Sequence, residues 1–115
     1  MVVSVARGAL SLADLRAHRD FVDNHVAYDP SLGLLFDLRR VSQFALTPDD
    51  VRNHAGFGAV GMPRFRRIGI LVEDDLAYGM SRVFQAYTNN RYADDSIRVI
   101  REAAGAWQWV RGQAI

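Results

Sequence analysis

Three histidines, His18, His25 and His54, are the side chains of this sequence best suited to metal or acid–base chemistry. His18 and His25 are seven residues apart on one predicted helix. This spacing separates them by about 10 Å along the helix axis, too far to bind one ion. Asp14 lies one turn before His18, but a metal site needs at least three ligands and a supporting shell. The sequence therefore predicts no metal site, and the simplest interpretation is that His18 and His25 border an apolar stripe.

No nucleophile completes a catalytic pattern. The chain has no cysteine, which excludes disulfides, thiolate nucleophiles, zinc knuckles and iron–sulfur clusters, and it has no Gly-x-Ser-x-Gly motif. Residues 56–61 spell Gly-x-Gly-x-x-Gly, but a predicted helix precedes them and a strand follows, the reverse of the order that dinucleotide binding needs. We expect a protein that binds rather than catalyses, with no catalytic residue and no cofactor.

The best candidate site starts at Asp37, which is near the end of the predicted central strand and is followed by Arg39 and Arg40. Ligands of open α/β sheets bind at the edge where parallel strands end, and the next strand brings Asp74 and Asp75 to that edge. We therefore predict a pair between Arg39 or Arg40 and one of these acids. The alternative is that Asp37 only holds its own loop, since a carboxylate readily accepts hydrogen bonds from nearby amides.

Tyr78 and Arg82 extend this candidate site onto the following helix. They are four residues apart, so their side chains can touch, and aromatic residues and arginine are enriched at binding hot spots. The predicted partner- or ligand-binding set is therefore Asp37, Arg39, Arg40, Tyr78 and Arg82. The alternative for the helix is an exposed arginine that simply lies over a tyrosine ring.

The charge balance argues against nucleic acid as a partner. All fourteen basic residues are arginine, and thirteen interleaved acids leave a net charge of +1, whereas nucleic-acid binders usually carry a clear basic excess. The first residues do not form a signal peptide, and no apolar run is long enough to span a membrane. We therefore expect a cytoplasmic domain, for which peripheral membrane association and a homodimer stay open.

Apolar runs alternate with helical patterns along all 115 residues, which predicts a single α/β domain. Four strands are expected, at residues 2–6, 34–38, 67–72 and 97–100, with Gly8 turning the chain after the first. Four helices are expected after them in turn, at residues 11–24, 47–56, 74–90 and 102–110. Right-handed crossovers then place helices against a largely parallel sheet.

Helix starts and buried faces follow from local patterns. Ser11 with Asp14 and Thr47 with Pro48 are typical of helix N-termini. One face of the long helix is expected to be buried: Leu76, Met80, Val83, Phe84 and Tyr87. The central strands are expected to bury a second set: Leu35, Phe36, Ile68, Ile70 and Leu71.

With these elements placed, four stretches of the chain resemble the SpoIIAA-like, STAS-type domains. They are the Leu-Phe-Asp-Leu run at residues 35–38, the strand at 66–72, the helix at 74–87 and the alanine-rich helix at 103–109 that ends in tryptophan. Their order and spacing over nearly the whole chain carry the resemblance. It implies a small SpoIIAA/STAS-like α/β fold, with a mixed sheet of four or five strands and helices packed largely on one side.

The resemblance also implies a non-enzymatic, bacterial regulatory or scaffold module that binds another protein, as the anti-sigma-factor antagonists do. Those proteins are switched by phosphorylating a serine at a helix start, where this chain has Thr47 beside Asp49 and Asp50, so we expect no such switch. Related Sec14-type domains hold lipids, which gives a second hypothesis, a carrier or sensor of an apolar small molecule. A protein-binding module needs a flat or convex patch, whereas a carrier needs an enclosed apolar cavity.

Overall fold

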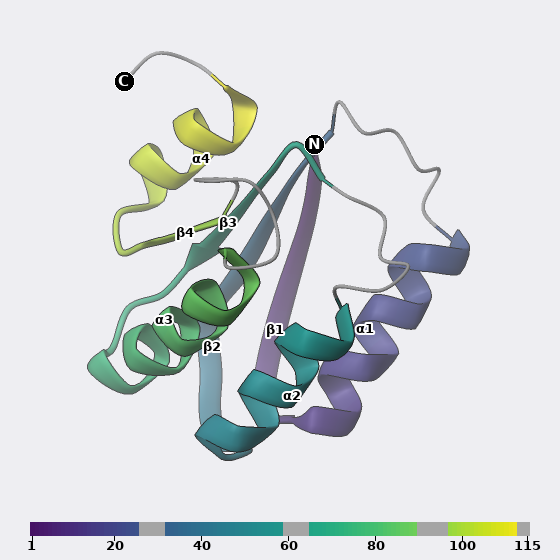
Figure 1. Ribbon diagram of the computed structural model, residues 1–115. Helices are drawn as coiled ribbons and strands as arrows, with labels where there is room; N and C mark the ends of the chain where they lie inside the picture. The colour runs from purple at the N-terminus through teal and green to yellow at the C-terminus, as the bar shows by residue number, and fades with distance from the viewer. Residues whose placement is uncertain (26–31, 59–64, 90–96, 113–115) are drawn as a thin grey trace.

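The computed structural model describes residues 1–25, 32–58, 65–89 and 97–112 (Figure 1). Its elements are β1 (Val2–Ser11), α1 (Leu12–His25), β2 (Gly33–Ala45), α2 (Pro48–Gly58), β3 (Arg67–Leu71), α3 (Asp75–Asn89), β4 (Ile97–Ile100) and α4 (Ala103–Arg111). The four strands of the described residues lie in the order β1-β2-β3-β4 and are parallel throughout. The α/β architecture is therefore confirmed, with a small correction: the sheet is parallel where the resemblance implied a mixed one.

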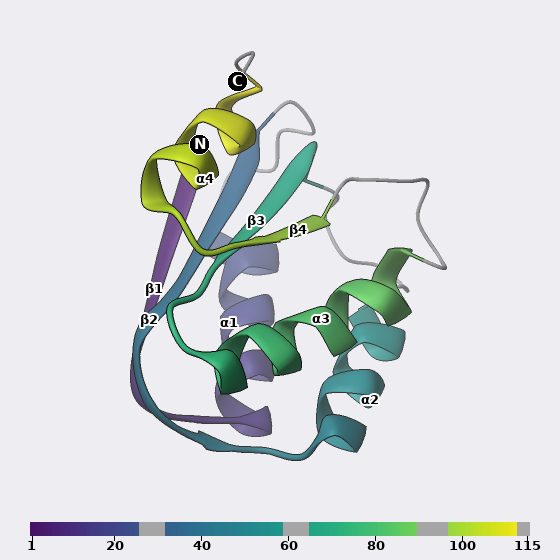
Figure 2. The ribbon, with the colours of Figure 1, turned by 90° about the vertical axis from the view of Figure 1, so that its left-hand side faces the viewer.

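The topology explains why three helices share one face of the sheet. Each connection moves one strand further in the same direction, and crossovers of one hand then leave their helices on the same side. Figure 2 shows α1, α2 and α3 on this side and α4 on the opposite side. Helix α4 packs against β2, β3 and β4. The expectation of helices largely on one side is confirmed.

The two faces of the sheet bury separate apolar cores, because successive strand residues point to opposite faces. The core beneath α1–α3 contains Leu10, Leu38, Val41, Ile70, Val72, Ala77 and Ile97. The core beneath α4 contains Leu35, Leu71, Ala106, Trp109 and Val110. Three of the predicted core residues, Leu35, Ile70 and Leu71, are buried, while Phe36 and Ile68 are only partly buried.

The predicted buried face of α3 needs one correction. Met80 is buried and Val83 and Phe84 are partly buried, as expected for one helical face. Leu76, however, is 61% exposed in the first turn of the helix. The prediction for Leu76 is therefore wrong, because helical periodicity indicates which face is apolar but not how much of that face neighbouring elements cover. The side chain of Tyr87 lies outside the described residues.

The predicted helix starts are confirmed. The Oδ2 atom of Asp14 accepts hydrogen bonds from the backbone N–H and the hydroxyl of Ser11, both at 2.9 Å, and Ser11 Oγ accepts the N–H of Asp14 at 3.2 Å. Thr47 and Asp50 exchange the same pair of bonds before α2, at 2.9 and 3.1 Å. Both are reciprocal capping boxes, which satisfy backbone donors that have no partner inside the helix.

Strands β1 and β2 are longer than predicted, because they continue as a two-stranded ribbon past the end of β3. After register shifts at Arg7 and Ala9, the second half of β1 pairs with β2 as far as Ala45. Gly8, with a φ of 71°, lies inside this ribbon and does not end the strand. Residues 39, 40, 42 and 43 of the ribbon are exposed. Because these residues are polar or charged, the sequence predicted a loop where the strand continues.

Gly33 allows α4 to approach the start of β2, and this contact gives a test of the packing. A Cβ at Gly33 would lie 2.6 Å from both Cγ1 and the backbone oxygen of Val110. We expect Gly33→Ala to lower the free energy of unfolding by about 1–3 kcal/mol, because the helix backbone must shift. The control is Gly79→Ala on α3, where an added Cβ meets nothing within 4 Å and helix propensity improves. Equal unfolding midpoints in urea for Gly33→Ala and the wild type would contradict this packing.

Candidate functional site

Asp37 is the last residue of β2 that pairs with β3, where it lies opposite Leu71. Its carboxylate is occupied by Arg39: the backbone N–H and Nε of Arg39 donate to Oδ1 at 3.0 Å, and Nη2 donates to Oδ2 at 2.9 Å. The Arg39 guanidinium holds the pKa of Asp37 below its usual range. Asp37 is therefore ionised at neutral pH and positions Arg39. This geometry agrees with the alternative that Asp37 stabilises its own segment.

Arg101, which follows β4, binds the segment between β3 and α3 at this edge of the sheet. Its Nη2 donates to Oδ1 of Asp75 at 2.7 Å and to the backbone oxygen of Glu73 at 3.1 Å. Its guanidinium carbon lies 5.1 Å from the centre of the Tyr78 ring. The strand ends of β3 and β4 are thus joined to the start of α3 through one arginine.

The predicted site residues therefore have partly different neighbours from those expected. In the described part of the chain, neither Arg39 nor Arg40 pairs with Asp74 or Asp75, so that prediction is wrong. Arg82 is exposed on α3, and the cation over the partly buried Tyr78 ring is Arg101 instead.

Sequence reasoning missed Arg101, although a signal for it was present. It directly follows the last predicted strand, and parallel strands end at the same edge of a sheet.

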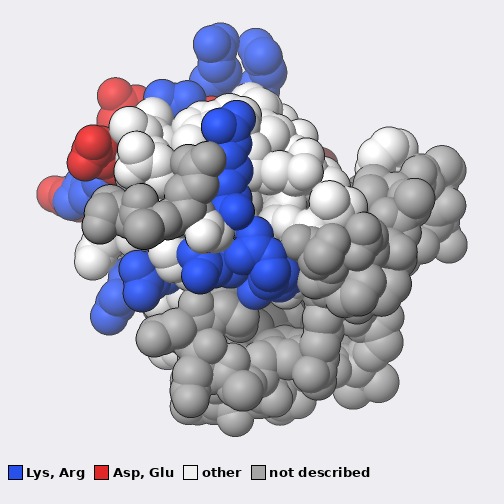
Figure 3. All heavy atoms as spheres, turned by 90° about the horizontal axis from the view of Figure 1, so that it is seen from above, with Lys and Arg blue, Asp and Glu red and all other residues white. Residues whose placement is uncertain are grey.

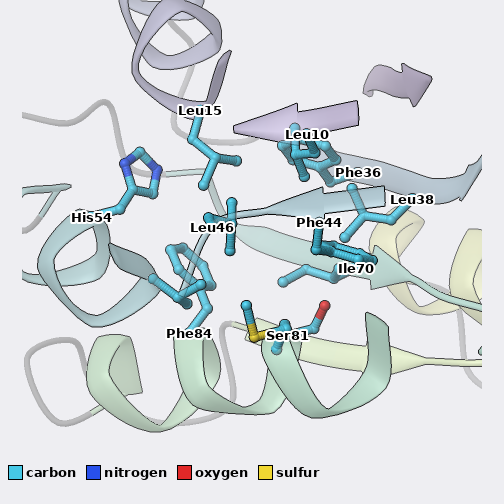
Figure 4. Close-up of a pocket in the computed structure, with 12 residues that line it drawn as sticks. Leu10, Leu15, Phe36, Leu38, Phe44, Leu46, His54, Ile70, Ser81 and Phe84 are labelled. Carbon is cyan, nitrogen blue, oxygen red and sulfur yellow. The ribbon is translucent and has the colours of Figure 1, made fainter. Parts of the chain in front are cut away.

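A mainly apolar cavity of about 80 Å³ lies between the sheet and helices α1–α3 (Figure 4). Space remains there because α2 packs mainly against α3 and α1 rather than on the sheet. Among the described residues, its lining is apolar except for His54 and Ser81: Leu10, Leu15, Phe36, Leu38, Phe44, Leu46, Val51, His54, Ile70, Met80, Ser81 and Phe84. Such a lining, apolar with a few polar groups, is typical of small-molecule sites.

His54 is the titratable group of this cavity. It is 8% exposed, its ring is 6.1 Å from that of Phe84 in a stacked arrangement, and its Nδ1 has no hydrogen-bond partner within the described residues. Burial lowers the pKa of His54 to about 4, and the positive charges of Arg19 and Arg16 act in the same direction. His54 is therefore uncharged at pH 7.

A second cavity, of about 260 Å³ and more polar, lies along β1 and α1. Nine of the described residues line it: Ser4, Val5, Ala6, Arg7, Ala9, Leu10, Asp14, His18 and Phe36. Nε2 of His18 lies 2.8 Å from Oγ of Ser4, and the His18 ring lies 4.7 Å from that of Phe36. Burial lowers the pKa of His18. Leu10 and Phe36 line both cavities, which therefore adjoin.

Four arginines of the described residues surround the C-terminal end of α4, at the end of the molecule seen in Figure 3. Nη2 of Arg66 and Nη1 of Arg67 donate to carbonyl oxygens of the last helical turn at 2.8 and 2.6 Å. Arg98 and Arg111 lie over the two tryptophan rings of α4, at 5.1 and 5.0 Å. Figure 3 shows arginine side chains across this end, with the acidic side chains to one side. Cations stabilise the carbonyl end of a helix, so this cluster has a structural explanation.

The described residues contain neither a metal-binding cluster nor a membrane-spanning helix. No group of three or more histidine, aspartate or glutamate side chains in residues 1–25, 32–58, 65–89 and 97–112 could hold a metal ion. Over the same ranges, no helix is long and apolar enough to cross a membrane.

The geometry thus defines a small parallel α/β domain with two adjoining cavities between the sheet and its helices. No protein-family model matches the chain, and no curated protein is significantly similar to it. Among solved structures it is similar to the crystal structure of an uncharacterized protein of the DUF3478 family with a SpoIIAA-like fold from Shewanella loihica PV-4. The TM-score is 0.61 and the identity 16%, over 94% of this chain and 82% of that chain. The SpoIIAA-like fold inferred from the sequence is therefore confirmed.

Proposed function

We propose that this chain is a non-enzymatic binding module whose ligand is a small apolar molecule, or the apolar chain of a larger one, held between the sheet and helices α2 and α3. The observation that carries the proposal is the mainly apolar cavity of about 80 Å³ at that place. A cavity of about 150 Å³ lined by leucine, isoleucine and phenylalanine stays dry and binds benzene. The smaller space here fits a short segment of an unbranched chain.

The state of His54 supports an apolar rather than a charged ligand. Because the imidazole is uncharged at pH 7, the described residues of the lining offer a buried ion no opposite charge, and burying an unpaired ion is costly. The second polar side chain of the lining, Ser81, is also uncharged. An uncharged, chain-like ligand is therefore the class that this cavity accepts at the lowest cost in desolvation.

The test is to fill the cavity. Val51 lines it from α2 and is buried, so Val51→Phe places a ring where the ligand would lie. We expect n-hexane to shift amide resonances of cavity residues in nuclear magnetic resonance spectra of the wild type, and Val51→Phe to weaken binding at least about tenfold. The matched control is Val3→Phe on the exposed side of β1, which should bind as the wild type does. Unchanged spectra with n-hexane, or equal binding by Val51→Phe, would refute the proposal.

A second candidate function is recognition of a protein partner at the carboxyl edge of the sheet. The specific observation is Leu76, an apolar side chain that is 61% exposed beside the cluster of Asp75, Tyr78 and Arg101. Arg40 and Arg82 are also exposed, and both belong to the set predicted from the sequence.

Affinity capture by Arg40→Ala and Arg82→Ala tests this second candidate. We expect both variants to melt at the wild-type temperature, because exposed arginines add little to stability, and to capture less of the native partner. Full capture by both variants would remove these two arginines from the contact surface. A large fall in melting temperature would instead show that they are structural.

A further inference from the structure

We propose that the ligand also carries an uncharged hydrogen-bonding head group, such as the hydroxyl of a short alcohol, and that Ser4 and His18 bind this group in the polar cavity beside β1. The inference rests on the proposed function, because it assigns the other end of the same ligand. It divides the site into an apolar compartment under α2 and a polar compartment between β1 and α1.

The adjoining position of the two cavities is the first observation. Leu10 of β1 and Phe36 of β2 line both the apolar cavity of about 80 Å³ and the polar cavity of about 260 Å³. Phe36 is only partly buried although it belongs to a central strand. An unbranched ligand that reaches both compartments must therefore pass these two side chains.

The second observation is the pair formed by Ser4 and His18. Its atoms, Oγ and Nε2, are 2.8 Å apart, and both residues line the polar cavity. One of them donates to the other, and which one depends on the histidine tautomer. In either tautomer, the hydroxyl and the imidazole keep hydrogen-bonding positions that the bond between them does not use. The pair can therefore accept a hydrogen bond from a ligand hydroxyl or donate one to it.

The charges around the polar cavity favour a head group without a net charge. Arg7 and Asp14 line it with opposite signs, and both are exposed. Asp14 Oδ2 is already bound by Ser11. His18 is partly buried against Phe36. A carboxylate bound by this uncharged pair would lose hydration, and the cation of the lining, Arg7, is exposed and opposed by the charge of Asp14. A hydroxyl only exchanges its hydrogen bond to water for one to Ser4 or His18.

The experiment compares three six-carbon probes, n-hexane, 1-hexanol and hexanoate, titrated at pH 7 and followed by nuclear magnetic resonance. The variants are His18→Phe, which keeps a ring against Phe36 but removes both nitrogens, and Ser4→Ala, which removes the hydroxyl. We expect each to weaken 1-hexanol binding about tenfold, the effect of one lost hydrogen bond, and to leave n-hexane binding within about twofold. Ala13→Ser, at an exposed position of α1 outside both cavities, is the control and should bind all three probes as the wild type does.

The outcomes separate the head group from the apolar site. If n-hexane binds but His18→Phe and Ser4→Ala both leave 1-hexanol affinity unchanged, the head-group assignment is overturned while the proposed function stands. Tighter binding of hexanoate than of 1-hexanol by the wild type overturns the uncharged head group. If neither n-hexane nor 1-hexanol binds, both proposals fall. Because two variants at opposite ends of one hydrogen bond are used, misfolding of one, visible as a lowered melting temperature, leaves the other to decide.

Discussion

Replacing Leu71 with alanine is expected to lower the free energy of unfolding by about 2–5 kcal/mol, the range for truncating a buried leucine. Leu71 is 0% exposed at the end of β3 and packs in the core beneath α4 with Leu35, Trp109 and Val110. Truncation removes transfer free energy and leaves a cavity that a parallel sheet between two layers cannot readily close. Urea unfolding at pH 7 measures the loss, provided that the unfolding free energy depends on urea concentration with the same slope in both proteins.

The matched control is the same substitution at Leu76, which sequence periodicity also predicted to be buried. Leu76 is 61% exposed on α3, so Leu76→Ala should change stability by no more than about 0.5 kcal/mol. A loss below about 1 kcal/mol for Leu71→Ala would place that residue outside a packed core and contradict the position of α4. A large loss of stability for Leu76→Ala would show that the Leu76 side chain is buried against neighbouring residues.

The element order could be predicted from the sequence because each helix start carries its own local chemistry. Ser11 with Asp14 and Thr47 with Asp50 form their capping bonds within four residues of chain, so no tertiary information is needed to place them. Dense apolar runs likewise marked β3, because a parallel strand covered on both faces has few polar positions. The boundary of β2 was missed, since residues 39–43 are mostly exposed and pair only with β1.

The position of Asp37 at the edge of the sheet was predicted from the sequence, but the contacts of the charged residues at that edge were not. Asp37 does lie where β3 ends, as the rule for parallel sheets requires. The partner of Asp75, however, is Arg101. Several arginines lie near this edge, and which of them pairs with Asp75 depends on distances between side chains, which cannot be calculated from spacing along the chain. The cavities were not predictable at all. The apolar cavity arises because α2 packs on α3 and α1 and leaves space above the sheet, which is a property of helix placement rather than of any motif.

His54 should make the folded state sensitive to acid over a defined range of pH. Its pKa is lowered from 6.5 to about 4 by burial and by the charges of Arg19, Arg16 and His18. In the unfolded chain the imidazole takes up a proton near pH 6.5, whereas in the folded protein it does so only near pH 4. Between these values the unfolded state binds more protons, so stability falls as the pH falls. The contribution is complete above pH 6.5 and lost on reaching pH 4.

We expect acidification through this pH range to lower the free energy of unfolding by about 2–3 kcal/mol, since each tenfold difference in proton affinity corresponds to about 1.4 kcal/mol. The measurement is urea unfolding at pH 7 and at pH 4.5 for the wild type and for His54→Phe, which keeps a ring beside Phe84 but cannot titrate. The variant should lose less stability than the wild type over this interval. His18→Phe isolates the contribution of the second histidine with a lowered pKa. The Asp37 carboxylate, whose pKa is held below 3.8 by Arg39, acts at lower pH and does not confuse the comparison. An equal loss of stability in the wild type and in His54→Phe would show that His54 is not buried uncharged in the cavity.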